Sequence, residues 1–114
     1  MSKIKIKYHW LPCLYATYYP MLKRIARYHG YSLALHGSLK RDMDLVAIPW
    51  IEKPKPPFKL LKAFRKAIGI ERSDNQAYDS TTKKPHNRVS YTMQMGGGGY
   101  MDISIIEPKG LWDK

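Results

Sequence analysis

The segment DMDLVAIP, residues 42–49, constrains the fold more than any other because acidic and apolar side chains alternate within it. Successive side chains of a β-strand point to opposite faces, so Asp42 and Asp44 share one face while Met43 and Leu45 share the other. The apolar face can pack on a helix, whereas neighbouring carboxylates repel each other and are costly to desolvate. The segment therefore predicts a sheet with one covered face and one polar face.

The remaining elements follow from periodicity and from turn residues. Pro20 is typical of the first turn of a helix, with Thr17 or a nearby residue as its cap, and Gly30 and Gly69 are typical helix ends. The polar segment 71–87 has no clear period and is predicted to be a long loop. The predicted elements are a strand at 3–7, a helix at 20–29, strands at 31–38 and 42–49, a helix at 57–68, and strands at 88–95 and 100–108.

This order predicts an α+β fold, with a small mixed β-sheet and two main helices in a single domain spanning residues 1–114. Hydrophobic residues make up 44% of the chain and charged residues 25%, which is typical of a globular protein with one modest core. No apolar run approaches the roughly 20 residues that span a bilayer, and the sequence MSKIKIKYHW lacks the apolar region of a signal peptide. Cys13 is the only cysteine, so no internal disulfide is expected. We therefore expect a cytoplasmic protein.

The net charge is strongly positive. The chain has 20 Lys and Arg residues against 9 Asp and Glu, a formal charge of +11. A small domain this basic usually meets an anionic partner such as a nucleotide or a nucleic acid, although lysines can also serve solubility alone. The basic residues are spread along the chain and form no separate tail.

A third acid, Asp102, stands alone in the apolar segment YMDISII. If this segment lies beside residues 42–49, its carboxylate converges with those of Asp42 and Asp44. Oxygen ligands on rigid strands suit Mg²⁺ or Mn²⁺, and three acids can hold two such ions about 4 Å apart for phosphoryl or nucleotidyl transfer. The alternative is structural: Asp42 caps a turn, Asp44 pairs with an arginine such as Arg41 or Arg88, and Asp102 meets a lysine.

Gly37 and Ser38 precede the paired acids. Glycine lets the backbone approach a phosphate closely, and the serine N–H and hydroxyl can donate hydrogen bonds to its oxygens. The pattern GSLKRDMDL with a later DIS resembles the DNA polymerase beta-like nucleotidyltransferase superfamily, which has a Gly-Ser pair, an Asp-x-Asp on the next strand and a third acid on a later strand. The resemblance implies that Gly37 and Ser38 hold the triphosphate. It also implies that Asp42 and Asp44 bind metal, and that Asp102 completes the catalytic site and helps activate an acceptor hydroxyl.

The chain is also similar to small, mostly uncharacterised bacteriophage proteins with an HGSLxRDxDLxAxPW block followed by a KPHxR…GGGxYxDxS block. This likeness implies a viral origin and the host cytoplasm as the location. The segment KPHNR begins a strand that is expected to neighbour Asp102, and other basic residues flank the acids in sequence. The predicted nucleotide-binding residues are Gly37, Ser38, Lys40, Arg41, His86 and Arg88, and His36 is a further candidate.

Two main functions remain open at this point, and a third is a plain nucleic-acid-binding protein whose acids are structural. The first is a minimal enzyme that uses Mg²⁺ or Mn²⁺ to transfer a nucleotidyl group from a nucleoside triphosphate to a hydroxyl acceptor. The second is a catalytically inactive module of the same fold that binds a nucleotide, a nucleic acid or a host defence protein. The intact set of acids favours the first. The short segment of three residues between Ser38 and Asp42 favours the second, because the superfamily has a longer segment with a helical turn there.

Overall fold

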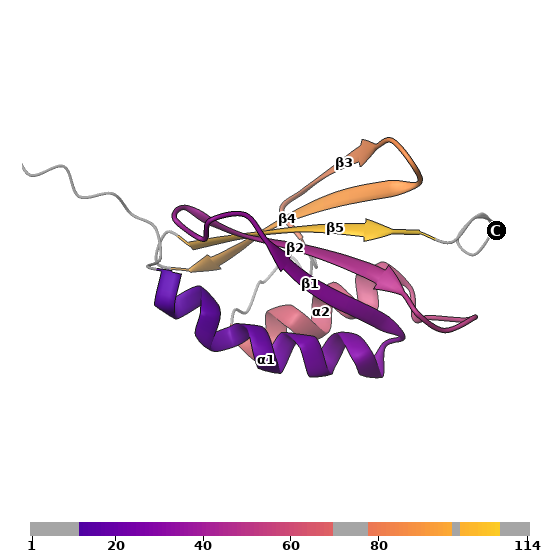
Figure 1. Ribbon diagram of the computed structural model, residues 1–114, viewed down its shortest axis with the longest axis horizontal. Coiled ribbons are helices and arrows are strands. Elements are labelled where there is room, and N and C mark those ends of the chain that lie inside the picture. The colour runs from indigo at the N-terminus through magenta and orange to yellow at the C-terminus, as the bar shows by residue number, and fades with distance from the viewer. Residues whose placement is uncertain (1–11, 70–77, 97–98, 108–114) are drawn as a thin grey trace, which may run out of the picture.

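The computed structural model describes residues 12–69, 78–96 and 99–107 of the chain. It has an α+β fold with a five-stranded mixed sheet and two helices that lie on the same side of the sheet (Figure 1), as the sequence predicted. The strand predicted at residues 3–7 lies outside the described residues. The elements are α1 (Pro12–Tyr28), β1 (Tyr31–His36), β2 (Asp42–Pro49), α2 (Pro57–Ile68), β3 (Ser80–Lys84), β4 (Arg88–Gly96) and β5 (Gly99–Ile106).

The sheet has the strand order β1-β2-β5-β4-β3. The two inner strands β2 and β5 run parallel to each other, and all other neighbours are antiparallel. Parallel strands need a long crossover connection, and here the chain between β2 and β5 contains α2 and the β3–β4 hairpin. The crossover therefore places two segments that are far apart in sequence side by side at the centre of the sheet.

The core lies between the helices and one face of the sheet. Alternate residues of β2 and β5 are buried, and the residues between them are partly or fully exposed, so the strands keep the two-residue period that the sequence predicted. We call the second face, which the helices leave uncovered (Figure 1), the open face. The core residues are Tyr15, Leu22, Ala26, Tyr31, Leu33, Met43, Leu45, Ala47, Leu60, Leu61, Phe64, Tyr91, Met93, Met95, Met101, Ile103 and Ile105.

Helix α1 begins at Pro12, about two turns before the predicted start, and Pro20 lies inside it. An internal proline removes one helical hydrogen bond and costs about 3 kcal/mol. Tyr15, Leu22 and Ala26 are fully buried on one face of this helix, and each burial of a large apolar side chain contributes about 1.5–3 kcal/mol. Burial of Tyr15 before Pro20, together with the two hydrogen bonds of its hydroxyl, offsets the proline, which the sequence prediction weighted too heavily.

The predictions for the helix ends were partly wrong. Thr17 caps nothing, because it lies within α1 and its Oγ1 donates to the Cys13 carbonyl at 2.7 Å. Gly30 does follow α1, and Gly69 ends α2 in the left-handed conformation and donates its N–H to two carbonyls of the last turn, as predicted. Neither helix of the described residues is long and apolar enough to cross a bilayer.

The predicted loop at 71–87 contains the strand β3. All five residues of β3 are exposed, so the strand has no buried face and shows no alternation of apolar and polar residues. It pairs with β4 through a tight turn in which His86 and Asn87 adopt positive φ values of 65° and 58°. An edge strand with both faces in solvent has no hydrophobic period, so it could not be recognised from the sequence.

Candidate functional site

Three acidic side chains project from the open face. Asp44 of β2 and Asp102 of β5 are register partners in the parallel pair, and Asp42 lies two residues before Asp44 on the same face. His36 of β1 is the register partner of Asp44 on the other side. The sheet therefore places the side chains of His36, Asp44 and Asp102 in one row across three adjacent strands.

Thr92 of β4 continues this row as the register partner of Asp102. Its Oγ1 donates to Asp102 Oδ1 at 2.6 Å, so one carboxylate oxygen already has a partner and the side chain is oriented. Among the residues that the structure describes, no three His, Cys, Asp or Glu side chains are gathered closely enough to share one ion. The backbone brings the carboxylates to one face, and their side chains would have to turn toward one another to bind a common cation.

The carboxylates influence one another electrostatically. Partial burial raises the pKa of the Asp44 carboxyl, and the negative charge of Asp102 raises this pKa further. The neighbouring His36 lowers the pKa of Asp44, and the charge of Asp42 raises it. Within the described part of the chain, the charged neighbours that move this pKa are two acids and one histidine, with no lysine or arginine among them. This finding speaks against the alternative in which Asp44 is a partner of Arg41 or Arg88.

Gly37 provides the space in which the Asp44 carboxylate lies. A Cβ atom at this position would stand 2.6 Å from Asp44 Oδ2, closer than side-chain carbons approach other heavy atoms. The backbone φ of Gly37 is +77°, which favours glycine as well. The glycine of the predicted Gly-Ser pair is thus in direct contact with one of the predicted metal ligands.

Ser38, Lys40 and Arg41 complete the loop between β1 and β2 and lie beside Asp42, where β2 begins. Their side chains are exposed, and Ser38 Oγ accepts a hydrogen bond from the Lys40 backbone N–H at 3.3 Å. The Ser38 hydroxyl can still donate to an anion, because it only accepts in this contact. Four of the six predicted nucleotide-binding residues are therefore next to the acids.

The other two predicted nucleotide-binding residues, His86 and Arg88, lie away from the acids. His86 lies in the β3–β4 turn, and Arg88 begins β4 as the partner of Ile106. Thr92, the neighbour of Asp102, is four residues further along β4, which corresponds to about 13 Å of strand. The strand that KPHNR begins does pair with the strand of Asp102, as predicted, but its first residues lie at the opposite end from the β1–β2 loop.

Tyr15 is a site residue that the sequence did not reveal. It is fully buried, and its hydroxyl donates to the Arg41 carbonyl at 2.6 Å and accepts from the Tyr100 backbone N–H at 3.3 Å. Arg41 precedes β2 and Tyr100 lies near the start of β5, so one hydroxyl of α1 connects the beginnings of both acid-bearing strands. The only sequence signal is the helical spacing of Tyr15 from Leu22, which requires α1 to start early.

Asparagine in place of Asp44 is expected to stabilise the protein in the absence of divalent cations. A raised pKa means that the fold disfavours the ionised form, so the destabilisation is full above the folded pKa and vanishes below the unfolded value of about 3.9. Removing the charge should raise the free energy of unfolding by about 0.5 kcal/mol, a value typical of cross-strand pairs. This corresponds to a rise of about 2–4 °C in Tm. Thermal unfolding in EDTA at neutral pH, and again at about pH 3, measures both the gain and its loss.

The matched control is Glu52→Gln, which removes one negative charge from the exposed segment after β2. We expect this variant to unfold at the wild-type temperature at both pH values. A wild-type protein that is more stable than Asp44→Asn at neutral pH in EDTA would contradict the repulsion between the carboxylates.

The open face thus combines hard oxygen ligands, a glycine that admits a carboxylate, and a loop with an exposed hydroxyl and two exposed cations. Carboxylates are the ligands that Mg²⁺ and Mn²⁺ prefer, and cations beside them can hold phosphate groups. Comparison of the chain with protein-family models, with curated proteins and with solved structures found no match.

Proposed function

We propose that the protein is a minimal nucleotidyltransferase. It uses Mg²⁺ or Mn²⁺, held by Asp42, Asp44 and Asp102, to transfer a nucleotidyl group from a nucleoside triphosphate to a hydroxyl acceptor. The observation that carries the proposal is the register of the central strands, which pairs Asp44 with Asp102 on the open face of the sheet. Two acids from segments far apart in sequence occupy adjacent positions there. They lie next to a loop whose side chains can donate hydrogen bonds to phosphate groups.

The donor set suits a hard divalent cation. The three side chains provide only carboxylate oxygens, and rigid strands carry all of them. Burial raises the pKa of Asp44 first, and the charges of Asp102 and Asp42 raise it further, so a bound cation would relieve the cost of the ionised form. When bound, the metal would neutralise charge on the triphosphate and on the attacking and leaving oxygens.

The protein side chains supply the positioning. Lys40 and Arg41 are exposed next to Asp42, where they can hold the phosphates that reach the acids. The hydrogen bond from Thr92 fixes one oxygen of Asp102 and leaves the other to face the acceptor. Much of the rate gain in such a reaction comes from holding the reactants in line and from preorganised charge, so a loop of this kind contributes directly.

The test is incubation of the full chain with the four nucleoside triphosphates, each labelled at the α-phosphate, together with Mg²⁺ or Mn²⁺ and a bacterial extract as a source of acceptors. We expect the label to enter a larger product, and we expect either cation alone to raise the melting temperature. Transfer of a γ-label without the α-label would contradict nucleotidyl transfer. Failure of both cations to change the melting temperature would contradict the metal site.

The second candidate is a binding module of the same fold without catalysis. The observation that favours it is the compact β1–β2 loop, in which Leu39 has a positive φ of 61° and packs against the core. This inward residue shortens the part of the loop that can wrap around a triphosphate. Calorimetric binding of a nucleotide with no labelled product after long incubation would favour this candidate.

A further inference from the structure

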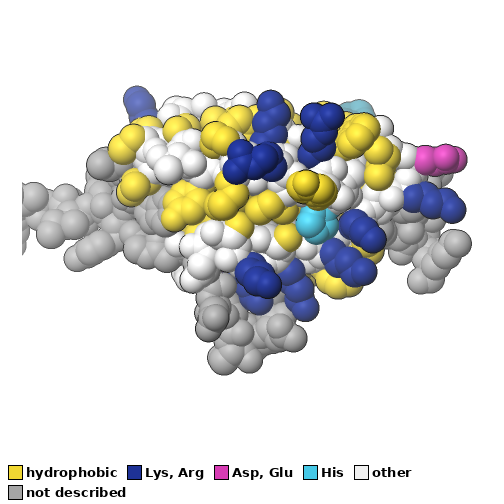
Figure 2. Space-filling model, turned by 90° about the horizontal axis from the view of Figure 1, so that it is seen from below, with side chains coloured by type: hydrophobic (Ala, Val, Ile, Leu, Met, Phe, Trp, Pro, Cys, Tyr) yellow, Lys and Arg dark blue, Asp and Glu magenta, His cyan; other side chains and the backbone are white. Residues whose placement is uncertain are grey.

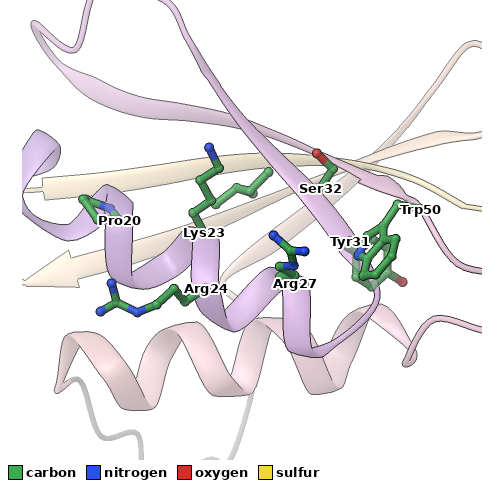
Figure 3. A pocket seen from close by; sticks show the side chains of 8 residues that line it. Pro20, Lys23, Arg24, Arg27, Tyr31, Ser32 and Trp50 are labelled. Carbon is green, nitrogen blue, oxygen red and sulfur yellow. The ribbon is translucent and has the colours of Figure 1, made fainter.

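A groove runs between α1 and the outer edge of β1, away from the acids. It has a volume of about 470 Å³, within the range of about 300–1,000 Å³ that is typical of ligand sites. In Figure 3, Lys23 and Arg27 rise from α1 toward the strand, Pro20 lies at one end, and Tyr31 and Trp50 lie at the other. The groove is lined by Pro20, Lys23, Arg24, Arg27, Tyr31, Ser32, Leu33 and Trp50.

The charge of the groove is positive on one wall. Lys23, Arg24 and Arg27 are exposed on α1, and no acidic side chain is among the lining residues that the structure describes. The helical side of the molecule carries the same sign, because neither α1 nor α2 contains an Asp or Glu. Figure 2 shows Lys and Arg side chains spread over this side between apolar patches, with acidic side chains only at one end. The groove therefore fits an anion.

An aromatic ring lies beside these cations. Trp50 is 55% exposed, and the Arg27 guanidinium carbon lies 5.7 Å from the centroid of its ring. A cation at this distance from an indole is attracted to the ring face, which holds the two side chains together. An exposed indole with Arg27 beside it, and with Lys23 and Arg24 further along the same helix, can stack on an unpaired base while the cations hold phosphates of the same strand.

We propose that this groove binds single-stranded nucleic acid. Two features select this ligand. The cations of α1 match a phosphate backbone, and the exposed ring of Trp50 offers a stacking surface for an unpaired base, whose faces are not covered by a neighbouring base pair. A site of this kind is sequence-tolerant, because every base has a face that can stack.

The same groove is a poor site for strand addition by a protein partner. β1 is an edge strand, and its outward carbonyl at Leu33 already accepts a hydrogen bond from the Tyr19 hydroxyl at 2.9 Å. Lysine and arginine side chains over an edge discourage pairing with another strand. The positive charge of α1 and the Leu33 carbonyl, which already has a hydrogen-bond partner, both favour a nucleic acid over an extended peptide.

The groove does not depend on the acids of the proposed active site. Ser32 in the groove is four residues before His36 in the row of acids, which corresponds to about 13 Å along β1. A strand held in the groove could supply an acceptor hydroxyl to the acids, but binding itself involves none of them. Asp44→Asn and Asp102→Asn should therefore bind the same oligonucleotide with wild-type affinity, which separates failure of this inference from failure of the enzyme proposal.

The experiment measures fluorescence anisotropy of a labelled oligothymidylate of about 12 nucleotides, within the site sizes of known single-strand binders. The groove variant Lys23→Gln/Arg24→Gln/Arg27→Gln is compared with Lys59→Gln/Lys62→Gln/Lys66→Gln on α2. Both variants remove three exposed positive charges from one helix. We expect the groove variant to bind at least about tenfold more weakly and the α2 variant to stay within about threefold of wild type.

Salt dependence and Trp50 give two further readouts. Loss of three phosphate contacts should reduce the slope of log affinity against log salt by about 2, measured between about 50 and 200 mM salt. Trp50→Leu should weaken binding by about 5- to 100-fold, and an abasic oligonucleotide of the same length should lose a similar factor with wild-type protein. The proposal is overturned if the α2 variant loses as much affinity as the groove variant, or if duplex DNA or polyglutamate binds as tightly as the single strand.

Discussion

Asparagine in place of Asp44 or Asp102 is expected to reduce nucleotidyl transfer by about 10²- to 10³-fold, because each loss of about 1.4 kcal/mol of transition-state stabilisation costs a factor of ten. The two residues are register partners on parallel strands, so both lie at the centre of the proposed site. Asparagine keeps the size of each side chain and removes its charge. The measurement is the rate of α-label incorporation, together with the rise of the melting temperature in Mg²⁺.

The fold should survive both substitutions. Thr92 can still donate to the amide oxygen of an asparagine at position 102, so the hydrogen bond across β4 and β5 remains possible. Glu52→Gln is the control, because Glu52 is exposed outside the sheet and its loss should leave the rate unchanged. Wild-type rates in Asp44→Asn or in Asp102→Asn would remove these acids from the chemistry.

The covered and polar faces of the central strands could be predicted from sequence. The alternation in residues 42–49 and again around Asp102 fixes which side chains share a face, and the structure keeps this parity in the pairing of β2 with β5. Predicting that the two strands would be neighbours required the resemblance as well, since parity alone says nothing about strand order. The α+β class followed from the order of periodic segments, because strands and helices have different periods.

Other features depend on tertiary contacts that no local pattern records. Tyr15 connects the starts of β2 and β5 only because α1 continues across Pro20, and this continuation depends on burial against the sheet. The role of Gly37 depends on the direction of the Asp44 carboxylate. This carboxylate lies against Gly37, so the contact joins the end of β1 to β2. The position of Arg88 at the far end of the sheet depends on the length of the β3–β4 hairpin, and β3 itself left no periodic signal.

Alanine in place of Gly30 is expected to destabilise the protein by about 3 kcal/mol. Gly30 is buried between α1 and β1 with a φ of +90°, a conformation that costs other residues about 1–2 kcal/mol. A Cβ would also stand 2.8 Å from the Pro54 Cα and 2.7 Å from Ile51 Cδ1, and overpacking of this kind costs about 1–3 kcal/mol. The backbone at Pro54 cannot move aside as a flexible side chain could. Thermal unfolding should show a Tm lowered by about 10 °C or more.

Gly69→Ala separates the two contributions. Gly69 has nearly the same φ, +88°, but a Cβ there would meet no atom within 4 Å. This variant should therefore lose only the conformational part, about 1–2 kcal/mol, and the difference between the two variants measures the contact with the segment after β2. That segment is joined to the α1–β1 turn by two backbone hydrogen bonds, from Trp50 N–H to the Gly30 carbonyl at 3.0 Å and from Lys55 N–H to the His29 carbonyl at 2.8 Å. Equal losses in the two variants would mean that the segment yields to the new methyl group, and that these two bonds do not hold it in place.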